Sequence, residues 1–80
     1  MQIQLLLFGI VADLIGKNAI DFTVKDRPSV KEFKKILIEK YPQLKNYNSY
    51  AVAVNETYAQ DDLVLKEKDV IAIIPPVSGG

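Results

Sequence analysis

The chain has 80 residues, of which 49% are hydrophobic and 25% are charged, so it is predicted to be one small, ordered globular domain. Its ten basic and ten acidic residues cancel, which removes the usual electrostatic driving force for nucleic-acid binding. Because it has no cysteine and no histidine, the composition excludes a disulfide scaffold, a thiolate metal site, a cysteine nucleophile and a histidine base.

Targeting signals are also lacking in the sequence. The N-terminus has no basic region followed by a cleavage site, as a signal peptide would. No apolar run approaches the roughly 20 residues of a membrane span. We therefore expect a soluble, cytoplasmic protein.

The first quarter of the chain predicts two strands and a short helical connection. Residues 2–8 alternate between two faces at period two, as a strand does. Residues 10–16 are short and apolar, and we expect a single helical turn that ends at Gly16. Residues 19–24 alternate again. The two strands are expected to pair like a hairpin with a long connection.

A single long helix is predicted after a break at Asp26-Arg27-Pro28. Ser29 and Glu32 have the spacing of a capping box, in which the serine hydroxyl and the glutamate carboxylate each accept a free backbone amide. Apolar side chains then recur at helical spacing, namely Val30, Phe33, Leu37 and Tyr41. The helix is expected to end at Tyr41-Pro42, because a residue before proline avoids the helical conformation.

The second half predicts three more strands. Residues 50–54 form a third strand, and residues 57–59 form a very short one after a turn at Asn55-Glu56. Residues 70–74 form the last strand. Two prolines follow it at once and prevent it from continuing.

A second turn is predicted at Asp61-Asp62, with Leu63 and Leu65 packed beneath it. Together with Glu56, the two aspartates could suggest a metal site. Their spacing is not that of a calcium loop, and aspartate is common in turns, so we expect no metal here.

The order strand, strand, helix, strand, short strand, strand is typical of an α+β domain with one main helix packed on one face of a mixed sheet of four to five strands. Placing the first and last strands side by side at the centre buries the most apolar segments. The domain is expected to cover residues 1–74, with a flexible tail at residues 75–80 that carries the Gly-Gly end.

The tail reads Pro-Pro-Val-Ser-Gly-Gly and is the candidate functional segment. Glycine has no Cβ, so Gly79 suits a slot that is too narrow for other residues. Six extended residues span roughly 20 Å, enough to reach a buried site in another protein. No other part of the chain forms an obvious catalytic site, which makes the terminal carboxylate of Gly80 the candidate reactive group. The alternative is a frayed end that happens to finish in glycine.

Apolar residues on the central strands also alternate onto the face away from the helix. If Ile3, Leu5 and Leu7 face the helix, their neighbours face outward and form one apolar patch that consists of Leu6, Phe8, Ala72 and Ile74. Scattered apolar residues on a surface are common. Four that cluster on neighbouring strands favour a partner interface.

Four stretches of the chain resemble a known family. They are Ala12–Gly16, Ser29–Phe33, Ala53–Asn55 and the ending Ile73–Gly80. The pattern resembles the ubiquitin-like sulfur carriers of the β-grasp fold, and more closely the small-subunit family of molybdopterin synthase, over essentially the whole chain. Two positions depart from the family: Ala12 stands where a basic residue is usual, and Lys68 where glycine is favoured.

The resemblance implies a chemistry for the C-terminus. An activating enzyme would use ATP to adenylate Gly80, and a sulfur donor would displace AMP to leave a thiocarboxylate. The large synthase subunit would bind the tail through Pro75, Pro76, Val77 and Ser78, in a heterotetramer of two small and two large subunits. Sulfur would then enter cyclic pyranopterin monophosphate during molybdenum cofactor biosynthesis. The chain itself would be a non-catalytic, sulfur-donating subunit with no bound cofactor.

Three alternatives stay open at this point. The first is a sulfur carrier for thiamine or another pathway, although those carriers typically lack the sequence Pro-Pro-Val-Ser before their Gly-Gly end. The second is a ubiquitin-like modifier that is joined through Gly80 to lysines. The third is a non-covalent interaction domain, in which the tail would have no role.

Overall fold

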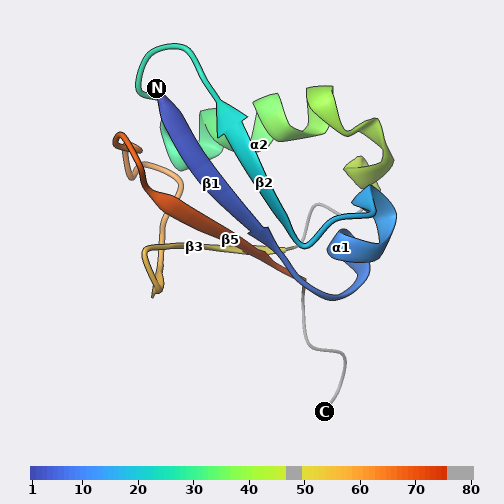
Figure 1. Cartoon of the computed structure of the whole chain (residues 1–80). Coiled ribbons are helices and arrows are strands. Elements are labelled where there is room, and N and C mark those ends of the chain that lie inside the picture. The colour runs from blue at the N-terminus through green and yellow to red at the C-terminus, as the bar shows by residue number, and fades with distance from the viewer. Residues whose placement is uncertain (47–49, 76–80) are drawn as a thin grey trace.

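The computed structural model describes residues 1–46 and 50–75 (Figure 1). Two helices, five strands and one 3-10 turn appear in these residues. In chain order they are β1 (Gln2–Leu7), α1 (Gly9–Ile15), β2 (Ala19–Thr23), α2 (Val30–Lys40), the 3-10 turn η1 (Pro42–Leu44), β3 (Ala51–Val54), β4 (Thr57–Tyr58) and β5 (Val70–Ile74).

The five strands form one mixed sheet in the order β2-β1-β5-β3-β4. β1 and β5 pair in parallel, with Leu5 opposite Ile71 and Leu7 opposite Ile73. The β1–β2, β3–β5 and β3–β4 pairings are antiparallel. The prediction that the first and last strands lie side by side at the centre is therefore confirmed, and so is the mixed sheet.

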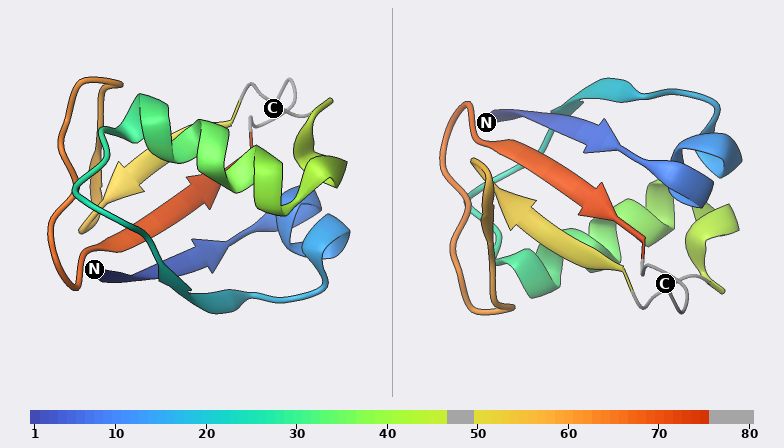
Figure 2. Two further views of the ribbon diagram at one scale, coloured as in Figure 1. Left: turned by 90° about the horizontal axis from the view of Figure 1, so that it is seen from above. Right: turned by 90° about the horizontal axis from the view of Figure 1, so that it is seen from below.

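α2 packs across one face of this sheet and leaves the other face without a helix (Figure 2). The core lies between the two layers. Phe33 of α2 is fully buried and meets Phe22 of β2 edge-on, with ring centroids 5.7 Å apart and planes at 75°. Burying one such aromatic side chain contributes about 2–3 kcal/mol of hydrophobic free energy. The other fully buried side chains are Leu5, Val11, Val30, Leu37, Leu44, Leu65, Ile71 and Ile73.

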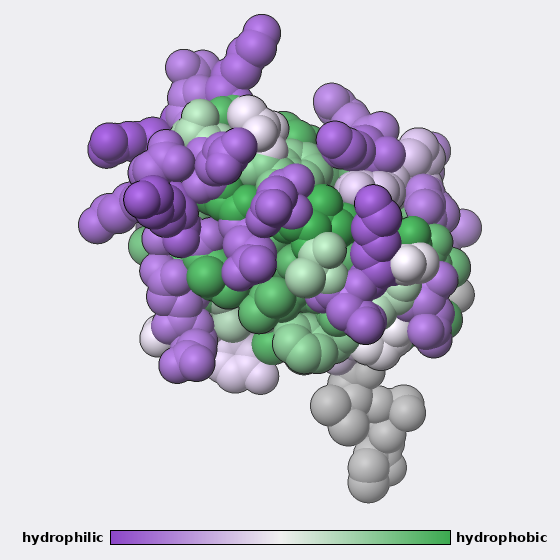
Figure 3. All heavy atoms as spheres, viewed as in Figure 1, coloured by the Kyte–Doolittle hydropathy of each residue, from purple (hydrophilic) through white to green (hydrophobic). Residues whose placement is uncertain are grey.

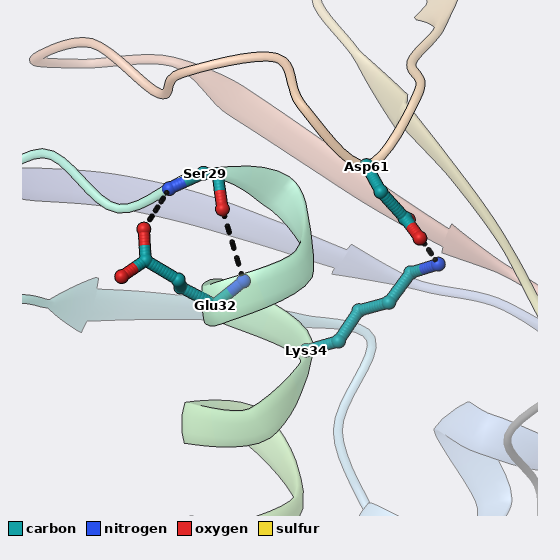
Figure 4. Close-up of polar contacts among 4 residues, drawn as sticks. All are labelled: Ser29, Glu32, Lys34 and Asp61. Carbon is teal, nitrogen blue, oxygen red and sulfur yellow. Dashed lines mark hydrogen bonds and ion pairs between the residues drawn. The ribbon is translucent and has the colours of Figure 1, made fainter.

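α2 begins at the capping box that its sequence predicts (Figure 4). The Glu32 amide donates to the Ser29 hydroxyl at 3.2 Å, and the Ser29 amide donates to the Glu32 carboxylate at 3.0 Å. One turn further along, the Lys34 ammonium pairs with Asp61 at 3.0 Å and connects the helix to the loop before β5. The two side chains are 30% and 59% exposed, so the pair is partly screened by solvent and its contribution to stability is small.

Two local predictions were wrong. α1 has seven residues, about two turns rather than one, although it does end at Gly16, where φ is +83°. Residues 42–44, for which no element was predicted, form a 3-10 turn that buries Leu44. Leu63 is 43% exposed and does not pack beneath the turn, whereas Leu65 is fully buried. The Leu63 amide donates to the Gln60 carbonyl at 3.1 Å, so the backbone of Leu63 still belongs to the turn.

Within residues 1–46 and 50–75, neither helix has the length and apolar character that crossing a bilayer requires.

Candidate functional site

The predicted site divides into two parts. Gly79 and Gly80, and with them Pro76, Val77 and Ser78, lie outside the residues that the structure describes. Pro75 is the last described residue, and it follows directly after the end of β5. The structure therefore describes the base of the tail and the sheet face beside it.

The four residues predicted to form an outward apolar patch do lie together on the sheet face that α2 leaves open (Figure 2, right). Leu6 of β1 is opposite Ala72 of β5, which places their side chains on the same face. Phe8 and Ile74 continue that face at the strand ends, and Phe8 is 48% exposed. Together with their neighbours they line a shallow groove of about 340 Å³, here called the open-face groove; its lining is Leu6, Phe8, Ala53, Glu56, Tyr58, Val70, Ala72 and Ile74.

Part of this lining was not predicted from the sequence. Val70 shares the outward parity of Ala72, so the same alternation could have identified it. Tyr58 is 72% exposed and comes from the two-residue strand β4. Nothing in its local sequence indicated this position, because β4 joins the groove only through its pairing with β3. An exposed tyrosine at an apolar groove is typical of a protein interface.

Figure 3 shows the surface from the direction of Figure 1. Apolar surface (green) runs across the middle of the molecule, and hydrophilic side chains (purple) surround it. This direction is at right angles to the view of the open face in Figure 2.

Hydrogen bonds hold the β3–β4 turn against the start of β5. The Asn55 amide group donates to Asp69 at 2.9 Å, and the Val70 backbone amide donates to the Asn55 side-chain oxygen at 2.9 Å. The second Asp69 oxygen accepts the Lys66 amide at 2.8 Å, and Asp69 is buried. This network fixes the end of the groove that is formed by Glu56 and Val70.

At the opposite end of the sheet, β1 and β5 both finish beside α1 (Figure 1). Here the ring of Pro75 lies against Gly9, the first residue of α1. No role at the base of the tail was predicted for Gly9. This contact joins residues far apart in the sequence, so local patterns carry no signal for it.

The described residues offer little acid–base chemistry at the groove. Hydrogen bonds from the backbone and hydroxyl of Ser29 hold the pKa of Glu32 below its usual value, and burial raises the pKa of Tyr50. Neither residue lines the open-face groove. Within the described ranges, no three acidic side chains gather to hold a metal ion, the Asp61-Asp62 turn included. The arrangement is suited to binding an apolar surface rather than to moving protons.

Comparison with known proteins gives the family. The model of the ThiS family matches residues 5–80. The chain belongs to the ThiS family. Among curated relatives, a protein of Arabidopsis thaliana named molybdopterin synthase sulfur carrier subunit is 39% identical over 81 residues, which cover 100% of this chain and 84% of the relative. A protein of the same name from Dictyostelium discoideum is 38% identical over 84 residues and is covered to 96%.

Solved structures give the same fold for this ThiS-family chain. SAMP1 from Haloferax volcanii superposes with a TM-score of 0.85 at 24% identity over 100% of both chains. A chain of the complex of subunits 1 and 2 of molybdopterin-converting factor from Helicobacter pylori superposes with a TM-score of 0.70 at 26% identity, again over 100% of both chains. The predicted ubiquitin-like β-grasp fold is confirmed, with a second short helix beside the main one.

Proposed function

We propose that this ThiS-family chain is the sulfur carrier subunit of a molybdopterin synthase, acting in molybdenum cofactor biosynthesis. The observation that carries the proposal is similarity along the whole chain to relatives with that name, 39% identical in one case. The ending Pro-Pro-Val-Ser-Gly-Gly supports it, because the family model extends through residue 80.

The chemistry belongs to the carboxylate of Gly80. A carboxylate is a poor acylating agent, because its leaving group would be an oxide. An activating enzyme supplies ATP, the Gly80 oxygen attacks the α-phosphorus, and pyrophosphate leaves. Sulfide-level sulfur (HS⁻), released by a donor, then attacks the carbonyl carbon of the acyl adenylate; the new C–S bond replaces the C–O bond to the phosphate, and AMP leaves. The product is a thiocarboxylate, a good nucleophile that carries transferable sulfur.

Gly79 and Ser78 have supporting roles in this proposal. Gly79 lets the end pass through a narrow channel, because it has no Cβ. Ser78 contacts that channel but does not act as a nucleophile, since the chain has no histidine to serve as its base. No cofactor is held by the chain itself, and ATP is a substrate of the activating enzyme.

The partner we propose is the large subunit of the synthase, in an assembly of two small and two large subunits. The open-face groove supports this choice because it is apolar and lies on the face that α2 leaves uncovered. Ile74 lines the groove and Pro75 follows it directly, so one partner can cover the groove and receive the tail at the same time. The prolines would then stiffen the start of the tail.

An intact-mass measurement tests the proposal. The protein is incubated with ATP, an activating enzyme and a sulfur donor, and its mass is compared with that of a variant without Gly80. We expect a gain that matches one oxygen-to-sulfur exchange, which the variant does not show. No gain, under conditions that load a known carrier, would contradict the proposal.

Two further outcomes separate the alternatives. Conjugates of the protein with lysines of other proteins would favour a ubiquitin-like modifier. A thiocarboxylate that only a thiamine-pathway partner consumes would favour the other carrier function. For the proposed function, the loaded protein must transfer sulfur to the pyranopterin precursor when the large synthase subunit is present.

A further inference from the structure

The end of the sheet beside α1 is where the tail begins. β1 and β5 are parallel neighbours, with Leu7 opposite Ile73, so both chains leave the sheet at this end (Figure 1). After Leu7 the chain passes through Phe8 and enters α1 at Gly9. After Ile74 it passes into Pro75. Gly9, after β1, and Pro75, after β5, therefore lie close together. The side chain at position 9 limits where the Pro75 ring can lie.

Gly9 leaves that space open. Its φ is +56°, a conformation that residues with a Cβ rarely adopt. A Cβ at this position would lie 2.9 Å from Cγ of Pro75 and 3.8 Å from its Cδ. The shorter distance is well inside van der Waals contact, which is about 3.5–4.0 Å between carbon atoms. The proline ring is closed onto its own backbone, so Cγ cannot rotate away without moving the chain.

Gly16, at the other end of α1, provides the contrast. It also has a positive φ, +83°, and it closes the helix. A Cβ there would have no atom within 4 Å. A side chain at Gly16 would meet backbone strain only, whereas one at Gly9 would meet strain and the Pro75 ring. Gly16 therefore needs glycine for its backbone conformation alone, whereas Gly9 needs it both for the conformation and for the space beside Pro75.

We propose that Gly9 is a positioning residue for sulfur transfer: by lacking a side chain, it lets the Pro75 ring seat against the start of α1 and so sets the direction in which the reactive tail leaves the sheet. The inference rests on the proposed carrier function. In this inference Gly9, near the N-terminus, helps to position the C-terminal tail. Pro75 then has a second role besides stiffening the tail.

The contact itself can be tested without any activity. In the NMR spectrum of the free protein, we expect nuclear Overhauser effects between the α-protons of Gly9 and the γ-protons of Pro75. Gly9→Ala should remove this pattern and shift the resonances of Ile74 and Pro75, while Gly16→Ala leaves them in place. Absence of the effect in the unmodified protein would overturn the inference.

The functional test is a double-mutant cycle on transfer from carrier that already holds the thiocarboxylate. We expect Gly9→Ala to slow the transfer step at saturating large subunit by about tenfold or more, because small misplacements of reacting groups carry large rate penalties. Gly16→Ala should slow the transfer step less than about twofold, although it should lower Tm about as much as Gly9→Ala does. Introduced into a Pro75→Ala protein, Gly9→Ala should cost less than about threefold, since Cγ is gone.

Two results would reject Gly9 as a positioning residue. One is an equal cost of Gly9→Ala with and without Pro75, and the other is an equal effect of Gly16→Ala. If the unmodified protein cannot be loaded with sulfur, the proposed function fails, and a role of Gly9 in sulfur transfer fails with it. If loading succeeds and the cycle shows no coupling between Gly9 and Pro75, the proposed function stands and only the inference about Gly9 is rejected.

Discussion

Both faces of the central strands are apolar, but only one of them is covered by α2. On β1, Leu5 and Leu7 face α2 and are almost fully buried. Their neighbours Leu6 and Phe8 line the open-face groove, and Phe8 is 48% exposed. β5 repeats the pattern, with Ile71 and Ile73 in the core and Ala72 and Ile74 in the groove.

The difference teaches that apolar character by itself does not assign a residue to the core. The same residue types on one strand stabilise the fold on one face and remain available for a partner on the other. Substitutions on the covered face should therefore act on stability, and substitutions on the open face on binding. Four experiments test this separation, from the largest expected effect to the smallest.

The largest effect is expected at the centre of the covered face. Leu5→Ala removes a fully buried side chain and leaves a cavity, which costs about 3–5 kcal/mol of folding free energy. Urea denaturation measures this loss. The separation of the faces would break down if the variant kept its stability but lost its affinity for the large subunit.

Phe8→Asp tests the open face. It places a charge in the groove and should weaken binding to the large subunit by at least about 30-fold, as loss of an aromatic hot spot does. The fold should keep or gain stability, because Phe8 is the N-cap of α1 without a side-chain hydrogen bond, and aspartate is a preferred N-cap.

Ile10→Asp is the matched control, since Ile10 is 41% exposed but does not line the groove. Calorimetric titration should show a smaller loss of affinity for it than for Phe8→Asp. Equal losses would place the interface elsewhere.

Lys68→Gly should change stability and leave binding alone, since Lys68 belongs to neither face. Its φ is +68°, a conformation that disfavours side chains, and glycine is the residue that the family favours here. We expect a gain of about 1 kcal/mol, seen as a rise of several degrees in Tm. Lys45→Gly is the control: at φ −57° the same change should destabilise the protein by about 0.5–1 kcal/mol.

The smallest effect concerns the helix that covers the core. The hydrogen bonds from Ser29 lower the pKa of Glu32 from 4.5, so the ionised carboxylate stabilises the folded state. That contribution is complete above the unfolded pKa and is lost as the pH falls through the lower folded pKa. Glu32→Gln should therefore be less stable than the unmodified protein near neutral pH.

The difference should shrink in acid, and urea midpoints at a series of pH values measure it. A gap that does not change with pH would mean that the Glu32 charge contributes nothing. Ser29→Ala removes the uncharged partner and should cost about 1 kcal/mol, with most of that loss remaining in acid.

Much of the fold could be predicted because its signals are local. The Ser29 and Glu32 spacing predicted the start of α2, and the period-two alternation predicted β5 with its exact bounds. Local signals failed where a contact from elsewhere in the chain decided the outcome. Residues 42–44 form a 3-10 turn whose last residue, Leu44, packs in the core. Leu63 is held by its backbone, since its carbonyl accepts the amide of Val30 at the start of α2, while its side chain is 43% exposed.

The candidate site shows the same division. The parity of Leu6 and Ala72 predicted that they share the open face, because neighbouring central strands place side chains of equal parity together. Tyr58 could not be predicted, since a two-residue strand has no periodicity and reaches the groove through β3. Gly9 could not be assigned to the site either, because its meeting with Pro75 depends on the parallel register of β1 and β5.

The sequence by itself determined the strands, the capped helix, the apolar character of both faces of the central strands, and the Gly-Gly ending on which the proposed chemistry depends. These features depend on residue type and spacing along a few neighbouring residues. Tertiary structure alone decided which apolar face α2 covers, which side chains from four strands and their ends line the groove, and how the start of α1 holds the base of the tail. These depend on strand order and register, which bring together residues that are more than 60 positions apart.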